Sequence, residues 1–274
     1  MSKVWFVTGS SRGLGRAIVT AALDAGDRVA ATARDPRQLQ DLVERYGSRV
    51  LPIALDVADD AAVRSAVKAA VDAFGRLDVV VNNAGYGDLA AVEDIALDDF
   101  KAQIDTNFYG VVHVTKAVLP ILREQDAGHL FQVSSIGGRV GSVGLAAYQS
   151  AKWAVGGFST VLAQEVAPLG VKVTVLEPGG MRTDWSGSSM AIPPISDPYL
   201  PTVGASAERR RAAAGTEPID PSKVADVVRD LAGRDDAPLR LVIGADAYAL
   251  AAATAAAQAE SDERWRAVSE SVDF

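Results

Sequence analysis

Residues 3–26 read KVWFVTGSSRGLGRAIVTAALDAG, a stretch that predicts a short buried strand, a glycine-rich turn and an amphipathic helix in direct succession. Within the turn, Gly9, Gly13 and Gly15 let the backbone bend sharply and approach a pyrophosphate, whose charge would face the free N–H groups of the helix start. The glycine spacing is neither G-x-G-x-x-G nor that of a phosphate loop ending in GK[ST]. A strand, glycines and a helix in this order provide the context for a pyrophosphate-binding turn, with a plain connecting turn as the alternative.

The rest of the chain alternates between short apolar runs and helical segments. This pattern is typical of an α/β fold in which a parallel sheet is covered by helices on both faces. Three helices are indicated most clearly, over 100–122, 146–167 and 221–233, the last with proline near its start and glycine at its end. The seven expected strands are 3–7, 28–33, 50–55, 78–81, 129–133, 171–176 and 239–243.

Length and composition predict one domain over residues 1–274, since 274 residues with 49% hydrophobic content suit a single large core. The long irregular stretch 178–207 is rich in proline, glycine and serine, and its part from about 184 to 207 is expected to be a mobile lid over a ligand. An inert surface excursion is the alternative. The Ala-rich tail after about 248 is expected to be helical, serving an interface or lying on the surface.

Several classes of function are disfavoured by composition. A net charge of −8 argues against nucleic acid as a partner, and the run 209–211 of three arginines is interpreted as a solvated patch. The chain has no cysteine and only two histidines, His113 and His129, which are expected to be structural, so no metal site is predicted. No apolar segment resembles a signal sequence or a membrane span, and we expect a soluble cytoplasmic protein.

The segment AAYQSAK, residues 146–152, carries the strongest chemical signal. Its four-residue spacing stacks Tyr148 and Lys152 on one face of a helix and pairs a phenol with a cation. A free tyrosine titrates near pH 10, so a base that works near neutrality needs a pKa lowered by roughly 3, and a close ammonium group could supply most of that change. The pair alone can arise by chance, and the accompanying motifs decide its meaning.

Taken together, TGSSRGLG, NNAG at 82–85, Asn107, Ser135, YQSAK and the Pro-Gly pair at 178–179 resemble the single-domain short-chain dehydrogenase/reductase family. They occur in the family's order, and the resemblance covers residues 3 to about 245. It implies a Rossmann-like, doubly wound, seven-stranded parallel sheet and reversible hydride transfer between nicotinamide and a carbonyl or alcohol carbon.

The resemblance also implies four catalytic roles, with no departure from the family pattern at these positions. Tyr148 would be the acid and base, and Lys152 would lower the pKa of Tyr148 and bind the nicotinamide ribose. Ser135 would hydrogen-bond the reacting oxygen, with Ser134 as its competitor because neighbouring residues of a strand point in opposite directions. Asn107 would anchor a water relay to Lys152, or simply make a buried hydrogen bond to the backbone.

The cofactor contacts implied by the resemblance are spread over the carboxyl ends of the strands, where open α/β sheets bind ligands. The expected cofactor residues are Gly9, Ser11, Arg12, Gly13, Leu14, Gly15, Arg34, Asp56, Val57, Asn83, Ala84, Gly85, Tyr148, Lys152, Pro178, Gly179 and Thr183. Asp56 would contact the adenine amine, or else cap the following helix. Arg34 and Arg12 favour NADP over NAD, since NADP carries a 2′-phosphate. Asp35 could oppose that phosphate, or turn away and cap the helix after Pro36.

The expected substrate is a small, largely apolar molecule with one carbonyl or secondary alcohol. Candidate wall residues are Ile136, Val140, Leu145, Trp185, Met190 and Tyr199. A homodimer or homotetramer is expected from apolar helix faces and the tail. An idle NADP-binding redox sensor or scaffold is the alternative function, and dehydratase or epimerase chemistry is a third possibility.

Overall fold

The computed structural model describes residues 2–187 and 189–274 and contains one seven-stranded sheet whose paired strands all run parallel. The strand order is β3-β2-β1-β4-β5-β6-β7, so the order reverses between β1 and β4. This confirms the predicted Rossmann-like, doubly wound sheet, with strand bounds close to those expected. The strands are β1 (Val4–Val7), β2 (Arg28–Ala33), β3 (Val50–Ala54), β4 (Val79–Asn82), β5 (Gly128–Val133), β6 (Val171–Pro178) and β7 (Arg240–Ile243).

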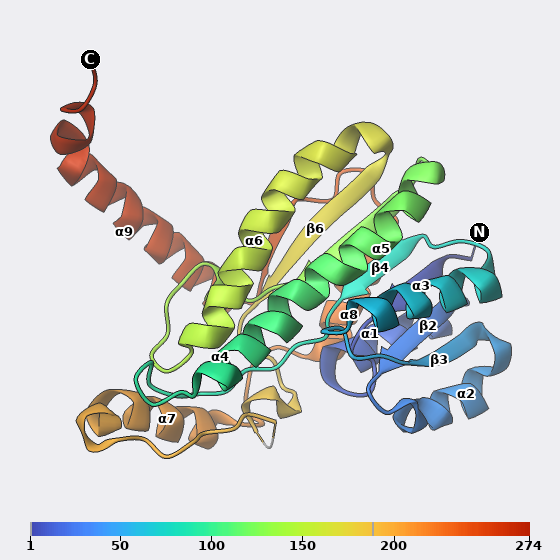
Figure 1. The fold of residues 1–274 in the computed structure, drawn as a ribbon, viewed down its shortest axis with the longest axis horizontal. Helices are drawn as coiled ribbons and strands as arrows, with labels where there is room; N and C mark the ends of the chain where they lie inside the picture. The colour runs from blue at the N-terminus through green and yellow to red at the C-terminus, as the bar shows by residue number, and fades with distance from the viewer. Residues whose placement is uncertain (1, 188) are drawn as a thin grey trace.

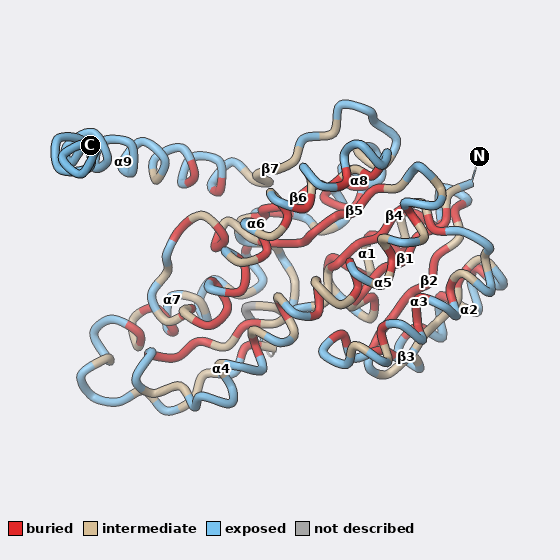
Figure 2. Tube along the Cα trace, turned by 45° about the horizontal axis from the view of Figure 1, so that its top comes forward, coloured by how far each residue is buried: buried red, intermediate tan, exposed pale blue. Residues whose placement is uncertain are grey.

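Two layers of helices cover the sheet (Figure 1). The helices are α1 (Gly13–Asp24), α2 (Gln40–Tyr46), α3 (Asp60–Phe74), α4 (Leu97–Ile104), α5 (Gly110–Glu124), α6 (Ala146–Val166), α7 (Ala205–Ala213), α8 (Pro221–Leu231) and α9 (Ala245–Glu270). One hydrophobic cluster joins α1, α2 and α8 to one face of the sheet, and a second joins α3, α5 and α6 to the other. The five inner strands β2, β1, β4, β5 and β6 are almost wholly buried, which explains why they read as continuous apolar runs, whereas the edge strands β3 and β7 are only partly buried (Figure 2).

The helix expected over residues 100–122 is interrupted. Between α4 and α5 the chain forms a π-helical turn, Asp105–Tyr109, that contains the fully buried Asn107. Such turns are rare and occur mainly at functional sites. The sequence pattern could not show this interruption, because a π turn keeps the helical periodicity on both sides.

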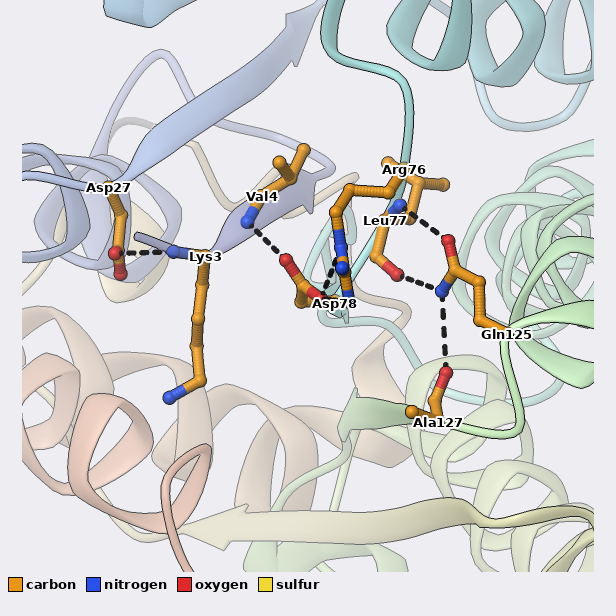
Figure 3. Close-up of polar contacts among 8 residues, drawn as sticks. All are labelled: Lys3, Val4, Asp27, Arg76, Leu77, Asp78, Gln125 and Ala127. Atoms are coloured by element: carbon orange, nitrogen blue, oxygen red, sulfur yellow. Dashed lines mark hydrogen bonds and ion pairs between the residues drawn. The ribbon is translucent and has the colours of Figure 1, made fainter. Parts of the chain in front are cut away.

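The amino ends of the central strands are held by polar side chains, at the edge opposite the strands' carboxyl ends (Figure 3). Asp27 accepts a hydrogen bond from the backbone N–H of Lys3 at 2.8 Å, and Asp78 accepts one from Val4 at 2.8 Å. Gln125 joins the chain segments that precede β4 and β5. These contacts satisfy backbone groups at the strand starts and leave the carboxyl ends free for a site.

The segment predicted to be a lid contains short 3-10 turns and a π turn that lead into α7, so its last residues are helical. Residue 188 of the predicted lid lies outside the described residues. The segment is tied to the loop after β4: Ala191 donates to the Asp88 carboxylate at 3.1 Å, and Ser196 donates to that of Asp94 at 3.0 Å. Its mobility stays a prediction, as does the single-domain organisation of residues 1–274.

The tail is a long helix, α9, that extends away from the rest of the molecule (Figures 1 and 2). Apart from its first turns, where Ala247 and Ala251 are buried, its side chains are mostly exposed. No helix within the described ranges combines the length and apolar composition that crossing a membrane requires.

Candidate active site

A cavity of about 380 Å³ lies at the carboxyl ends of the parallel strands, around the point where the strand order reverses. It brings together nearly all the residues that the sequence singled out. These are Gly9, Ser11, Arg12, Gly13, Leu14, Arg34, Asp56, Val57, Asn83, Ala84, Gly85, Asn107, Ser135, Tyr148, Lys152, Pro178, Gly179 and Thr183. Such a reversal point is where doubly wound sheets bind nucleotides.

Gly15 does not line the cavity but shapes the turn beneath it. A Cβ atom on Gly15 would overlap the Gly9 carbonyl oxygen and the Asn83 side-chain nitrogen. Gly9 and Gly13 have φ angles of +67° and +56°, in the left-handed region that favours glycine. Asn83 fixes the turn from outside by donating to the carbonyl oxygens of Thr8 at 2.9 Å and Gly9 at 3.0 Å. At its three glycines the turn therefore presents backbone, without side chains, at the start of α1.

Tyr148 and Lys152 lie on the inward face of α6, and both are buried. The Lys152 ammonium donates to the Val133 carbonyl at 2.8 Å and lies 5.6 Å from the centre of the Tyr148 ring. Burial raises the pKa of Tyr148 to about 12, while the Ser135 side chain and the charge of Arg210 act in the opposite direction. Burial also lowers the pKa of Lys152 to about 8. The expectation that Lys152 lowers the pKa of Tyr148 is not met here, because desolvation of the phenol dominates.

The two serines after β5 have different partners. Ser134 is buried and donates its hydroxyl to the Lys152 carbonyl at 3.1 Å, so it helps to hold α6 against the sheet. Ser135 begins the following 3-10 turn, and its oxygen accepts from the Gly137 N–H at 3.0 Å. Because the acceptor side of Ser135 is engaged, its hydroxyl proton can be donated into the cavity.

Asn107 is held rigidly, with its carbonyl oxygen left without a partner among the described residues. Its side-chain nitrogen donates to the carbonyl oxygens of Tyr86 and Gln103, each at 2.8 Å. A Cβ on Gly85 would lie 2.5 Å from that free oxygen and 3.5 Å from the Lys152 nitrogen. The missing side chain of Gly85 thus leaves space between an unpaired acceptor and a buried ammonium group.

The charged side chains expected to contact the cofactor differ in whether they line the cavity and in their protein partners. Arg12 and Arg34 are exposed and line the cavity. Asp35 does not line it: its carboxylate caps the 3-10 turn after Pro36 and pairs with Arg37 at 2.8 Å. Of the two roles considered for Asp35 from the sequence, the structure therefore shows the capping role. Asp56 lines the cavity and accepts from the Ala58 N–H at 3.0 Å, whereas the cap of α3 is Asp59, so the interpretation of Asp56 as that cap is wrong.

The predicted substrate walls divide into two groups. Ile136, Val140, Leu145 and Trp185 line the cavity. The Trp185 ring lies 5.0 Å from that of Tyr148, centre to centre. Met190 and Tyr199 are not among the lining residues: Met190 is buried in the packing behind them, and the Tyr199 hydroxyl donates to Glu93 at 2.7 Å. The prediction that Met190 and Tyr199 form part of the substrate wall was wrong, because sequence cannot show which apolar lid residue packs behind another.

Comparison with known proteins identifies the family. A profile of the short chain dehydrogenase family matches residues 3–191. The chain belongs to the short-chain dehydrogenase/reductase family. It is 60% identical to the oxidoreductase BOA17 of Botryotinia fuckeliana over 98% of both chains. It is also 35% identical to a short-chain dehydrogenase from Streptomyces avermitilis, whose crystal structure matches with a TM-score of 0.94 over 100% of both chains.

Solved structures of more distant members carry either form of the nicotinamide cofactor. An alcohol dehydrogenase from Thermococcus sibiricus is complexed with 5-hydroxy-NADP, with 27% identity, a TM-score of 0.74 and coverage of 89% of this chain and 96% of that one. A 3-ketoacyl-(acyl-carrier-protein) reductase from Brucella melitensis is complexed with NADH, with 25% identity, a TM-score of 0.74 and coverage of 88% and 96%. The chain is therefore a short-chain dehydrogenase/reductase oxidoreductase.

One residue of this short-chain dehydrogenase/reductase site escaped sequence reasoning. Arg210, on α7, lines the cavity together with Tyr148 and is only partly exposed. Its interpretation as part of a solvated arginine run was wrong for this residue and holds for Arg209 and Arg211, which are exposed. A helical wheel of α7 would have placed Arg210 beside the buried Ser206 and Ala207, which was the available signal.

Proposed function

We infer that this oxidoreductase is NADP(H)-dependent and interconverts a carbonyl and a secondary alcohol in a small molecule. The observation that carries this inference is that Asn107, Ser135, Tyr148 and Lys152 line one cavity together with the glycine turn. The glycine cradle and the unpaired Asn107 oxygen fit a dinucleotide and an ordered water. When bound, the nicotinamide would supply or accept the hydride.

The chain's own residues manage the proton. In reduction the carbonyl carbon gains a C–H bond, the π electrons move to oxygen, and that oxygen takes the Tyr148 proton. A pKa of about 12 keeps the Tyr148 phenol protonated at neutral pH, as a proton donor requires. The Ser135 hydroxyl donates to the same oxygen and stabilises its developing negative charge. Oxidation of the alcohol reverses these transfers.

Lys152 and Asn107 are suited to return the proton to Tyr148. The pKa of Lys152 is lowered to about 8, so its ammonium group can release a proton near neutral pH at moderate free-energy cost. The free Asn107 oxygen faces the same space beside Gly85, where a water could bridge it to Lys152. This water relay is part of the proposal.

The preference for NADP rests on charge. Arg12, within the glycine turn, and Arg34, directly after β2, are exposed arginines that line the cavity and are suited to a 2′-phosphate. The nearby carboxylate that would favour NAD, Asp35, is paired with Arg37. NAD remains the second cofactor candidate, since relatives with either cofactor are known.

The test of this proposal is to titrate purified protein with NADPH and NADH by fluorescence, then to follow NADPH absorbance with a panel of ketones and aldehydes. Arg34→Ala should weaken NADPH binding by roughly 10- to 100-fold, as expected for a lost charge-assisted contact, with little effect on NADH. Arg64→Ala, in an exposed pair on α3, is the control and should change neither. Equal effects of Arg34→Ala on both cofactors would refute the 2′-phosphate assignment.

An idle redox sensor is the second candidate, and tight NADPH binding without turnover would favour it. The complete set of four catalytic residues supports the enzyme instead. A homodimer or homotetramer and a cytoplasmic location belong to the same proposal. The exposed apolar side chains along α9, including Tyr248, Trp265 and Val268, are consistent with a surface that another subunit covers.

A further inference from the structure

Arg210 is fixed on the inward face of α7. One turn earlier, Ser206 and Ala207 are buried, and the Ser206 hydroxyl donates to the Val143 carbonyl at 3.1 Å. Residues three and four apart on a helix share a face, so this anchoring directs Arg210 toward the same side. The neighbouring Arg211 is exposed.

The Arg210 guanidinium lines the active-site cavity and has no partner among residues 2–187 and 189–274. Its Nε atom is buried and makes no hydrogen bond to any described residue, and no described carboxylate lies within ion-pair distance of it. Burial lowers the pKa of this arginine, which shows that its charge is held in a poorly solvated place. A buried cation is unfavourable unless it is paired, so the arrangement implies a negative group supplied from outside the chain.

The surroundings indicate which ligand carries that group. Tyr148, Val140, Leu145 and Trp185 line the cavity with Arg210. The charge of Arg210 acts on the Tyr148 phenol, so the guanidinium lies near the group that would react with the substrate. A second cavity of about 310 Å³ shares Ser142 and Arg210 with the first, so Arg210 stands where the two meet.

We propose that Arg210 binds a carboxylate of the substrate, so that the carbonyl compound acted on at Tyr148 is an organic acid with an otherwise apolar body. The inference rests on the proposed function and names its substrate class. A planar guanidinium pairs with a planar carboxylate through two parallel hydrogen bonds, and its single charge matches the single charge of a carboxylate. Val140, Leu145 and Trp185 surround the rest of the molecule.

The first experiment measures binding, independently of turnover. Isothermal titration of the NADP⁺-saturated protein compares benzoate, phenylacetate and 3-phenylpropionate with the three corresponding amides. At least one acid should bind about tenfold or more tightly than its amide, the effect expected of a charge-assisted pair. Arg210→Gln should remove this difference, Arg210→Lys should keep part of it, and Arg211→Gln should keep all of it.

Controls separate loss of the site from loss of the fold. Each variant should retain the wild-type NADPH affinity and at least the wild-type melting temperature, because Arg210 contributes no hydrogen bond to the described structure. Acid and amide binding equally to the wild type, or an acid preference that survives Arg210→Gln, would overturn the proposal.

The second experiment measures turnover. Benzoylformate and 3-benzoylpropionate are compared with their methyl esters, with NADPH oxidation followed by absorbance. Arg210→Gln should lower kcat/KM for the acids about tenfold or more and for the esters less than about threefold. Equal losses for acids and esters would show that Arg210 serves Tyr148 alone. Absence of turnover with Arg210-dependent acid binding intact would refute the reductase function and support the carboxylate site.

Discussion

Glu177 is a buried charge whose removal should destabilise the protein measurably. This carboxylate is fully buried in β6, next to the Pro-Gly pair of the cavity, and it accepts from Arg139 at 2.6 Å and from the Arg240 Nε at 2.9 Å. Arg139 follows the turn that begins at Ser135, and Arg240 begins β7. Glu177 therefore ties a catalytic loop and an edge strand to β6.

The size of the effect follows from burial. Breaking a buried ion pair by removing one partner costs about 3–5 kcal/mol, because the remaining charge is left without compensation. Arg139 and Arg240 have side chains that are 33% and 31% exposed, so water can partly solvate them and the lower end applies. We expect Glu177→Gln to lower the free energy of unfolding by about 3 kcal/mol and the melting temperature by roughly 6–10 °C.

Urea unfolding followed by circular dichroism measures this change, with Asp72→Asn as the control. Asp72 pairs with Lys68 on the surface of α3, where both side chains are mostly exposed, and such pairs contribute about 0.3–0.5 kcal/mol. If Glu177→Gln and Asp72→Asn lowered the free energy of unfolding by equally small amounts, the reasoning would be refuted, since burial is the difference between the two pairs.

Two further predictions follow from buried titratable side chains. Burial lowers the pKa of His129 to about 3, below its value of about 6.5 in an unfolded chain. Between pH 3 and pH 6.5 the unfolded state therefore binds more protons than the folded state, so the free energy of unfolding falls as the pH drops below about 6.5. Urea unfolding at pH 7 and pH 5 should differ by about 2 kcal/mol from this group, and the difference should shrink by that amount in His129→Gln; an unchanged difference would contradict the assignment. Tyr148→Phe should lower kcat on the order of 100- to 10,000-fold, the range for a lost proton donor, while NADPH affinity by fluorescence stays nearly constant; loss of cofactor binding instead would contradict the acid/base role.

The fold could be predicted from sequence because its determinants are local and repeated. Strands buried on both faces read as apolar runs, and the caps and glycines mark the helix ends, so seven strands were placed to within a few residues. Glycines with positive φ, such as Gly9 and Gly13, mark the turn itself. Many residues of the cavity, such as Asp56, Asn83, Ser135 and Gly179, follow the carboxyl ends of parallel strands, which meet at one edge by topology alone.

What could not be predicted depends on burial relative to partners distant in sequence. The pKa of Tyr148 was expected to fall because of Lys152, but its value depends on how far water is excluded, and spacing along a helix carries no information about that. In the same way Met190 and Trp185 belong to one lid segment and are both apolar, yet only Trp185 reaches the cavity.

Arg210 and Glu177 show why charged residues were the hardest to interpret. Both sit in sequences that read as ordinary, a run of arginines and the end of a strand. Glu177 is fully buried, and Arg210 is partly exposed with its Nε atom buried. Glu177 meets its two arginines within the protein, so its charge is compensated and its role is to hold the structure together. Arg210 meets no such partner among the described residues. Because a poorly solvated charge without a partner opposes folding, this difference between the two residues is what supports the proposal of a carboxylate on the substrate.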